Sequence, residues 1–130
     1  MDEPLPVLVV DDQAPFRMAA KAVVRRLGGF ALVGEAVNGS EAVALADELR
    51  PALVLMDINM PEMNGIEATR QIVASHPETV VILCLTYEIG DLPPDAAASG
   101  ARAYMNKERL SSAELQRLWD ERDSGSFRAS

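Results

Sequence analysis

Three short, nearly continuous apolar runs constrain the fold of this 130-residue chain more than any other feature of its sequence. They are Val7–Val10, Leu53–Met56 and Val80–Leu85, and each is followed by a polar residue. Runs of this length, rich in Val, Leu and Ile and without alternation, are typical of strands buried on both faces of a sheet. Two weaker segments, Phe30–Ala36 and Ala101–Met105, complete a set of five predicted strands.

Segments with helical spacing separate these strands. The first places apolar residues on one face between positions 16 and 27, after Pro15, which suits a first helical turn. Three polar residues that each precede a Glu by three positions predict the starts of further helices: Asn38, Asn64 and Ser111. A fourth helix, within residues 91–100, is predicted to be short because Pro93-Pro94 limits it to about two turns.

The alternation of strands and helices predicts an α/β fold. Parallel strands joined by right-handed crossovers place the helices on both faces of the sheet. We therefore expect a doubly wound, five-stranded parallel sheet in one domain over residues 1–122. The remaining residues, 123–130, have little apolar content and are predicted to form a flexible tail.

Composition excludes several classes of function. With 20 acidic and 12 basic residues the net charge is −8, and no block of Lys or Arg offsets it, so direct binding to nucleic acid is not expected. The single cysteine cannot form an intramolecular disulfide. The acidic N-terminus lacks the basic start of a signal peptide, and no apolar run could cross a bilayer. We expect a cytoplasmic protein that does not insert into membranes.

Polar residues follow four of the predicted strands at their carboxyl ends, where ligands bind in sheets of this kind. They are Asp11, Asp12, Asp57, Thr86 and Lys107. Three carboxylates at one edge repel each other, and Lys107 can offset only one of them. The remaining charge favours a divalent cation, and an all-oxygen site with few protein ligands suits Mg²⁺. A carboxylate beside such a metal can also act as a nucleophile toward phosphorus.

These residues resemble those of a known family. The features that carry the resemblance are Asp11-Asp12, the run from Met56 to Gly65, Thr86, and Tyr104 with Lys107. In order, spacing and residue type they are similar to the receiver domain of bacterial response regulators, which has the CheY-like, flavodoxin-like fold. The match spans residues 5 to about 119, and the segment Gly-Ile-Glu-Ala-Thr-Arg at 65–70 is most similar to receivers of LuxR/NarL-type regulators.

The resemblance implies a phosphorylation site. Asp57 would accept a phosphoryl group from a sensor histidine kinase or a histidine phosphotransfer protein. Mg²⁺ would be bound by Asp12, Asp57 and the backbone carbonyl of Asn59, with Asp11 acting mainly through water. Thr86 and Lys107 would hold the phosphoryl group, and Tyr104 would swing inward as Thr86 moves.

The same resemblance implies a switch. Phosphorylation would shift the surface between the fourth strand and the last helix between two states. An unknown downstream protein would read that surface, and a phosphorylation-linked homodimer is a further expectation. Receivers of this type usually precede a helix-turn-helix effector, which this sequence lacks, so we expect a stand-alone regulator, with a fragment of a longer regulator as the alternative.

Three features depart from the family pattern. Glu108 follows Lys107 where many receivers have proline, so the cis bond often found there is not expected. Tyr87 follows Thr86 where a small residue is usual, and with Glu88 it is predicted to modulate access to Asp57. The stretch from Thr86 to Gly100 is about one residue shorter than usual, so the predicted fourth helix is expected to be shortened or displaced.

Two alternatives remain open on sequence grounds. A haloacid-dehalogenase-like phosphatase also uses an Asp nucleophile with Mg²⁺, but its two acids lie two positions apart after the first strand, whereas Asp11 and Asp12 are adjacent. A pseudo-receiver would keep the fold and act by protein contact alone. The one histidine, His76, is predicted to be exposed at a helix end and to have no part in the chemistry.

Overall fold

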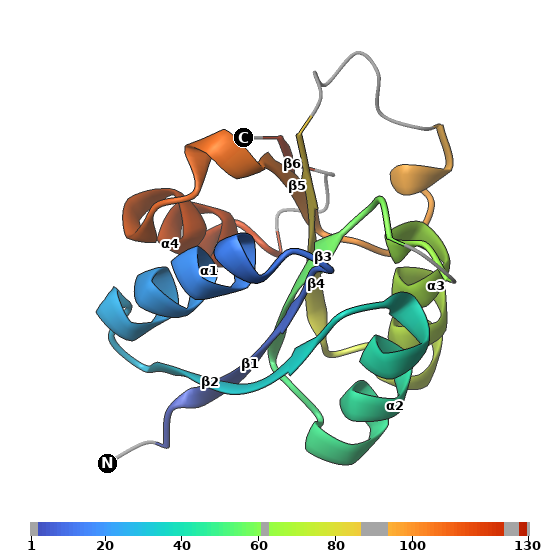
Figure 1. Cartoon of the computed structure of the whole chain (residues 1–130), viewed down its shortest axis with the longest axis horizontal. Coiled ribbons are helices and arrows are strands. Elements are labelled where there is room, and N and C mark those ends of the chain that lie inside the picture. The colour runs from blue at the N-terminus through green and yellow to red at the C-terminus, as the bar shows by residue number, and fades with distance from the viewer. Residues whose placement is uncertain (1–2, 61–62, 87–93, 124–127, 130) are drawn as a thin grey trace.

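The computed structural model of the chain describes residues 3–60, 63–86, 94–123 and 128–129 (Figure 1). Its strands are β1 (Leu5–Val10), β2 (Phe30–Ala36), β3 (Leu53–Asp57), β4 (Val80–Leu85), β5 (Ala103–Asn106) and β6 (Arg128–Ala129). Its α-helices are α1 (Ala14–Arg26), α2 (Gly39–Leu49), α3 (Gly65–Ser75) and α4 (Ser112–Asp120). Two short 3₁₀ helices are η2 (Pro94–Ala96) and η3 (Lys107–Arg109).

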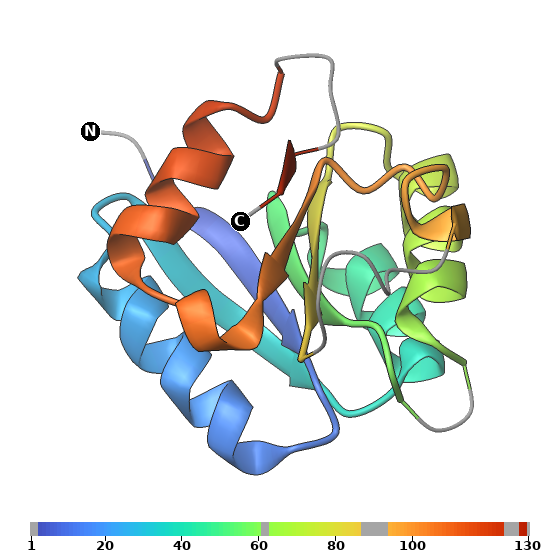
Figure 2. The same ribbon diagram turned by 90° about the horizontal axis from the view of Figure 1, so that it is seen from above.

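The strands form one parallel sheet in the order β2-β1-β3-β4-β5-β6. Helices α1 and α4 cover one face, and α2 and α3 cover the other (Figures 1 and 2). The predicted doubly wound, five-stranded sheet is therefore confirmed, with β6 as an additional short strand. No helix among the described residues is both long enough and apolar enough to cross a membrane.

Burial on both faces explains the continuous apolar runs. In β1, Leu8 and Val10 face the core beneath α2 and α3, whereas Val7 and Val9 face the core beneath α1 and α4. All four side chains are fully buried. The same division of alternate residues between two cores holds for β3 and β4, which is why neither strand tolerates a polar residue before its carboxyl end.

The predicted helix starts are confirmed in detail. Asn38, Asn64 and Ser111 each accept a hydrogen bond from the backbone N–H of the Glu three residues later, at 2.8, 2.9 and 3.1 Å. Each side chain thus satisfies one donor that the first helical turn leaves without an intrahelical partner. A cap of this kind contributes about 1 kcal/mol to stability.

Three expectations differ from the structure. Among the described residues of the stretch 91–100 only the 3₁₀ turn η2 and turns occur, because the paired prolines disfavour a longer helix. Two residues of the predicted tail, Arg128 and Ala129, pair with Ala103 and Tyr104 as β6; the flexibility of the tail stays a prediction. His76 is 9% exposed rather than solvated, because α2 packs beside α3 and places Asp47 Oδ1 2.7 Å from its Nε2.

Candidate functional site

The carboxyl ends of β1 and β3 bring three aspartates together. Asp11 and Asp12 directly follow β1, and Asp57 is the last residue of β3, the neighbouring strand. One carboxylate oxygen from each lies within 4.8 Å of the others. Asp11 is fully buried and Asp57 is 5% exposed, whereas Asp12 is exposed, so the cluster opens to solvent on the side of Asp12.

Backbone hydrogen bonds hold Asp11 in place. Its N–H donates to the Ala36 carbonyl at the end of β2, at 3.0 Å, and its Oδ1 accepts from the Gln13 N–H at 2.9 Å. The guanidinium of Arg17, one turn into α1, donates to the Asp11 carbonyl at 2.8 Å. The N-cap of α1 is Gln13 and makes no side-chain cap, so the aspartates do not serve as helix caps.

A glycine allows the start of α3 to lie against the end of β3. The Gly65 N–H donates to the Ile58 carbonyl at 2.9 Å, and the Ile58 N–H donates to the Cys84 carbonyl of β4 at 3.2 Å. A Cβ atom at Gly65 would overlap the backbone carbonyl oxygen of Asp57. Only glycine allows α3 to begin this close to the strand end that carries the Asp57 side chain.

Lys107 supplies positive charge to the cluster. It begins η3 directly after β5, and its Nζ lies 2.5 Å from Asp11 Oδ2 and 3.4 Å from Asp57 Oδ1. Burial favours the neutral amine, but the hydrogen bond to Asp11 and the charges of Asp57 and Asp11 outweigh it and raise the pKa of Lys107 above its usual range. The lysine therefore stays charged at neutral pH.

The folded environment of Asp57 disfavours the charged form of its carboxyl group. Burial, followed by the negative charge of Asp11, raises its pKa from 3.8 to about 6, against the opposing effects of Lys107 and the Asn59 N–H. One ammonium does not balance three carboxylates. A cluster of hard oxygen donors with an uncompensated negative charge and an open side fits a divalent cation such as Mg²⁺.

Comparison with known proteins agrees with this geometry. Residues 7–118 match the model of the response regulator receiver domain family. The chain belongs to that family. It is 41% identical over 105 residues to the transcriptional regulatory protein YdfI of Bacillus subtilis, covering 81% of this chain and 49% of YdfI. It is also 41% identical over 101 residues to the chemotaxis protein CheY of Thermotoga maritima, covering 78% of this chain and 83% of CheY.

The fold of solved receivers matches as well. A LuxR-family response regulator from Aurantimonas superposes with a TM-score of 0.83 at 28% identity, covering 97% of this chain and 89% of that one. The predicted family, and its likeness to LuxR-type receivers, are therefore confirmed. The chain spans about half the length of YdfI, and about four fifths of CheY. It is a receiver domain of two-component signalling, which gives the phosphatase alternative no support.

The remaining predicted site residues of the receiver fall into three groups. Thr86 directly follows β4 and is exposed, and Asn59, two positions after Asp57, is also exposed. Tyr104 lies on β5 beside Leu83 of β4 and is 8% exposed, so its ring is buried in this structure. Tyr87 and Glu88 lie outside the described residues, and their effect on access to Asp57 stays a prediction.

Two residues near the receiver site were not singled out from the sequence. Phe16 was interpreted only as part of the apolar face of α1, but its ring centre lies 4.7 Å from Lys107 Nζ. Arg17 bridges the Asp11 carbonyl and Glu35 of β2, at 2.8 and 3.2 Å. The sequence did contain one indication that both residues lie near the site: they are in the first turn of a helix that starts shortly after the two aspartates. Their contacts depend on where β5 and β2 end, which the sequence does not state.

The contact between Phe16 and Lys107 predicts a measurable coupling. Phe16→Leu keeps an apolar side chain against the core under α1 but removes the ring, so it should destabilise the receiver by about 1 kcal/mol. Urea unfolding measures this loss. In the Lys107→Met background the cost should fall by roughly half, because the ring no longer faces a cation. An equal cost in both backgrounds would show that the ring acts only through apolar packing.

Proposed function

We propose that Asp57 accepts a phosphoryl group from a sensor histidine kinase or a histidine phosphotransfer protein, and that this modification switches the receiver. The observation that carries the proposal is the arrangement around one carboxylate. Asp57 ends β3, has the further carboxylates of Asp11 and Asp12 beside it, and has Lys107 Nζ 3.4 Å from its Oδ1. The membership of the chain in the receiver family supports the same reading.

Asp57 would act as the nucleophile of the transfer. A carboxylate oxygen forms the bond to phosphorus as the P–N bond of the donor's phosphohistidine breaks, and the imidazole leaves with the bonding electron pair. The product is an aspartyl phosphate. Lys107, which already contacts Asp57, would pair with a phosphoryl oxygen, and Thr86 would donate a hydrogen bond to another. The raised pKa of Asp57 means that the charged, nucleophilic form prevails above a pH of about 6.

Asp11, Asp12, Asp57 and the Asn59 carbonyl would hold Mg²⁺. When bound, the metal ion would neutralise charge on the phosphoryl oxygens. The three aspartates offer it oxygen ligands at one edge of the sheet. Because Asp12 is exposed, its side of the cluster leaves room for water and for the incoming phosphoryl group.

The switch would involve the side of the sheet that carries β4 and β5. Phosphorylation replaces one negative charge by nearly two and adds acceptor oxygens that Thr86 can bind. Movement of Thr86 would bias the positions of Tyr104 and of the segments around η2, because Tyr104 packs in the same core as Leu85 and Ala96. A downstream protein or a second phosphorylated copy would read this surface, without direct contact between the receiver and nucleic acid.

Phosphorylation assays with matched variants test the proposal. The receiver is incubated with Mg²⁺ and a small phosphodonor, or with a histidine kinase that phosphorylates it, and the acid-stable, base-labile adduct is quantified. We expect one adduct per chain, none for Asp57→Asn, and wild-type amounts for Asp120→Asn, an exposed acid on α4. EDTA should suppress the reaction. Adduct formation by Asp57→Asn would contradict the proposal, and no adduct with any donor would favour a pseudo-receiver.

A further inference from the structure

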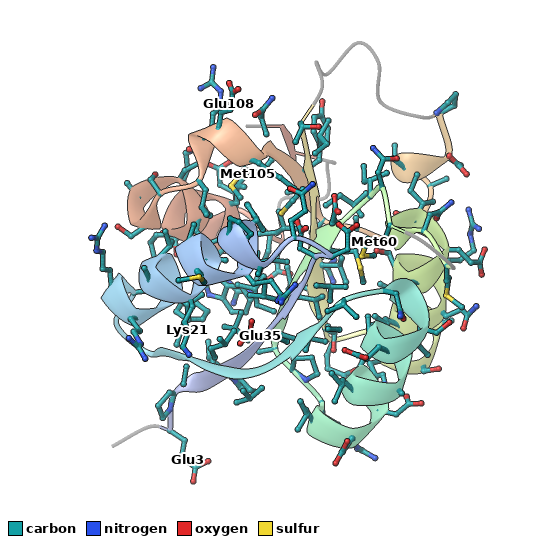
Figure 3. The ribbon with its side chains drawn as sticks, in the orientation of Figure 1. Glu3, Lys21, Glu35, Met60, Met105 and Glu108 are labelled. Carbon is teal, nitrogen blue, oxygen red and sulfur yellow. The ribbon has the colours of Figure 1, made fainter. Side chains whose placement is uncertain are left out.

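One groove on this receiver lies away from the aspartates. It has a volume of about 500 Å³ and runs between α1 and β2. One wall is formed by Lys21, Val24 and Arg25 of α1, and the other by the β2 residues 30–35. Figure 3 shows Lys21 and Glu35 between the ribbons of these two elements. Neither the aspartate cluster nor the switch surface uses this groove.

The backbone along the groove is a sheet edge that no other described strand pairs with. Strand β2 is the first strand of the sheet and pairs with β1 on its other side. The register slips by one residue at Val33, between Leu32 and Gly34, and the Val33 side chain is 43% exposed. Half of the N–H and C=O groups of such an edge strand point outward, where an added strand can pair with them.

The charged side chains that line the groove indicate which kind of partner it would bind. Lys21 and Arg25 are exposed, and no ion pair to either occurs within the part of the chain that the structure describes. At the far end, Glu35 is already paired with Arg17 at 3.2 Å. Among the described residues, two cations without an ion pair therefore line one wall of a groove that also contains apolar side chains. This local positive charge favours an acidic segment, although the net charge of the whole chain is −8.

The spacing of the cations matches an extended peptide. Four residues along a helix advance about 6 Å, and alternate residues of a strand on one face are about 6.6 Å apart. Acidic side chains at positions i and i+2 of an added strand can therefore reach both Lys21 and Arg25. A further apolar side chain on the same face would meet the part of the groove near Phe30 and Leu32.

We propose that the groove between α1 and β2 binds an extended acidic segment of a partner protein, which adds to the sheet at β2. The two strands β1 and β3 separate β2 from β4, where the proposed switch begins. Docking here is thus independent of phosphorylation. It would anchor the receiver to a partner in both signalling states, and it does not depend on the proposed role of Asp57.

A peptide titration on the unphosphorylated chain tests the docking. The probe is a fluorescein-labelled peptide, Gly-Glu-Thr-Glu-Thr-Val-Gly, followed by fluorescence polarisation at low salt. Lys21→Glu combined with Arg25→Glu should weaken binding by at least about tenfold. Arg26→Glu is the control for each single reversal, Lys21→Glu and Arg25→Glu, because it makes the same charge change on the same helix but does not line the groove. A peptide with Gln in place of Glu should bind about as weakly as the double variant does.

Amide hydrogen exchange locates the bound peptide. Outward-facing amides of residues 30–35 should become protected when the peptide binds, while those around Thr86 should not change. Equal weakening by Arg26→Glu, or protection that falls elsewhere, would overturn the proposal. So would citrate competing as well as the peptide, which indicates a small-anion site, or a concentration-dependent dimer of the chain alone that the double variant abolishes, which indicates that a second copy occupies the groove.

Discussion

Without divalent cations at pH 7.5, Asp57→Asn is expected to be more stable than the wild-type receiver, by on the order of 2 kcal/mol. Burial and the charge of Asp11 raise the pKa of Asp57 from 3.8 to about 6 in the folded chain. A raised pKa means that the folded state holds its proton more tightly than the unfolded state does. The charged carboxylate therefore costs stability at neutral pH, and the neutral amide removes that cost.

The pH dependence of this difference in stability tests its origin separately. Below about pH 4 the carboxyl is protonated in both states, so the two proteins should differ little. Between pH 4 and 6 the wild type loses stability relative to Asp57→Asn, and above pH 6 the gap is constant. Urea unfolding at several pH values, with Asp120→Asn as the control for an exposed acid, measures the gap. A gap that does not change with pH would contradict the origin assigned to it.

Mg²⁺ should reverse the order of stabilities. A cation bound by the aspartates stabilises the folded wild type by an amount that rises with the logarithm of one plus its concentration over the dissociation constant. Asp57→Asn removes one charged ligand and should gain much less. EDTA then restores the original order, which separates binding at the cluster from general effects of ionic strength.

Lys107→Met is expected to have the opposite effect, a loss of about 2 kcal/mol at pH 7.5 in EDTA. Methionine keeps the length of the side chain but removes the ammonium that lies 2.5 Å from Asp11 Oδ2 and 3.4 Å from Asp57 Oδ1. Two buried carboxylates are then left without a paired cation. The expected loss is less than that of a fully buried pair, because the lysine side chain is 11% exposed.

Two conditions should reduce the cost of Lys107→Met. Lowering the pH through 6 protonates Asp57 and removes part of the uncompensated charge. The raised pKa of Lys107 means that its contribution is complete below the unfolded value of 10.5 and is lost as the pH rises through the folded one. Lys21→Met, at an exposed position of α1, should cost less than about 0.5 kcal/mol. A similar cost for both variants would indicate that the cluster does not depend on the lysine charge.

The fold could be predicted from the sequence because strands buried on both faces consist almost entirely of apolar residues. The runs that became β1, β3 and β4 are apolar throughout because both of their faces are covered. The caps at Asn38, Asn64 and Ser111 were predictable because they depend on residues only three positions apart. The acids and the lysine could be brought together because parallel strands end at one edge of the sheet.

Features set by packing between distant elements were not predictable in the same way. His76 has the local sequence of an exposed helix end, yet α2 covers it and supplies Asp47. The sequence of α1 does not distinguish Phe16 and Arg17 from other helical residues. In the fold, Lys107, directly after β5, contacts Phe16, and Glu35 of β2 contacts Arg17. Residues 91–100, before β5, have few apolar residues at helical spacing and include two prolines, so their sequence does not specify a helix.

The central claim is that Asp57 is the one residue of this receiver that accepts the phosphoryl group. Peptide mapping by mass spectrometry, after reaction with Mg²⁺ and a phosphodonor and rapid quenching in acid, tests it most directly. We predict one phosphoryl adduct per chain, on the peptide that contains Asp57, and its loss on brief treatment with base. An adduct on Asp11, Asp12 or His76, or an unmodified Asp57 peptide under conditions that phosphorylate other receivers, would contradict the account.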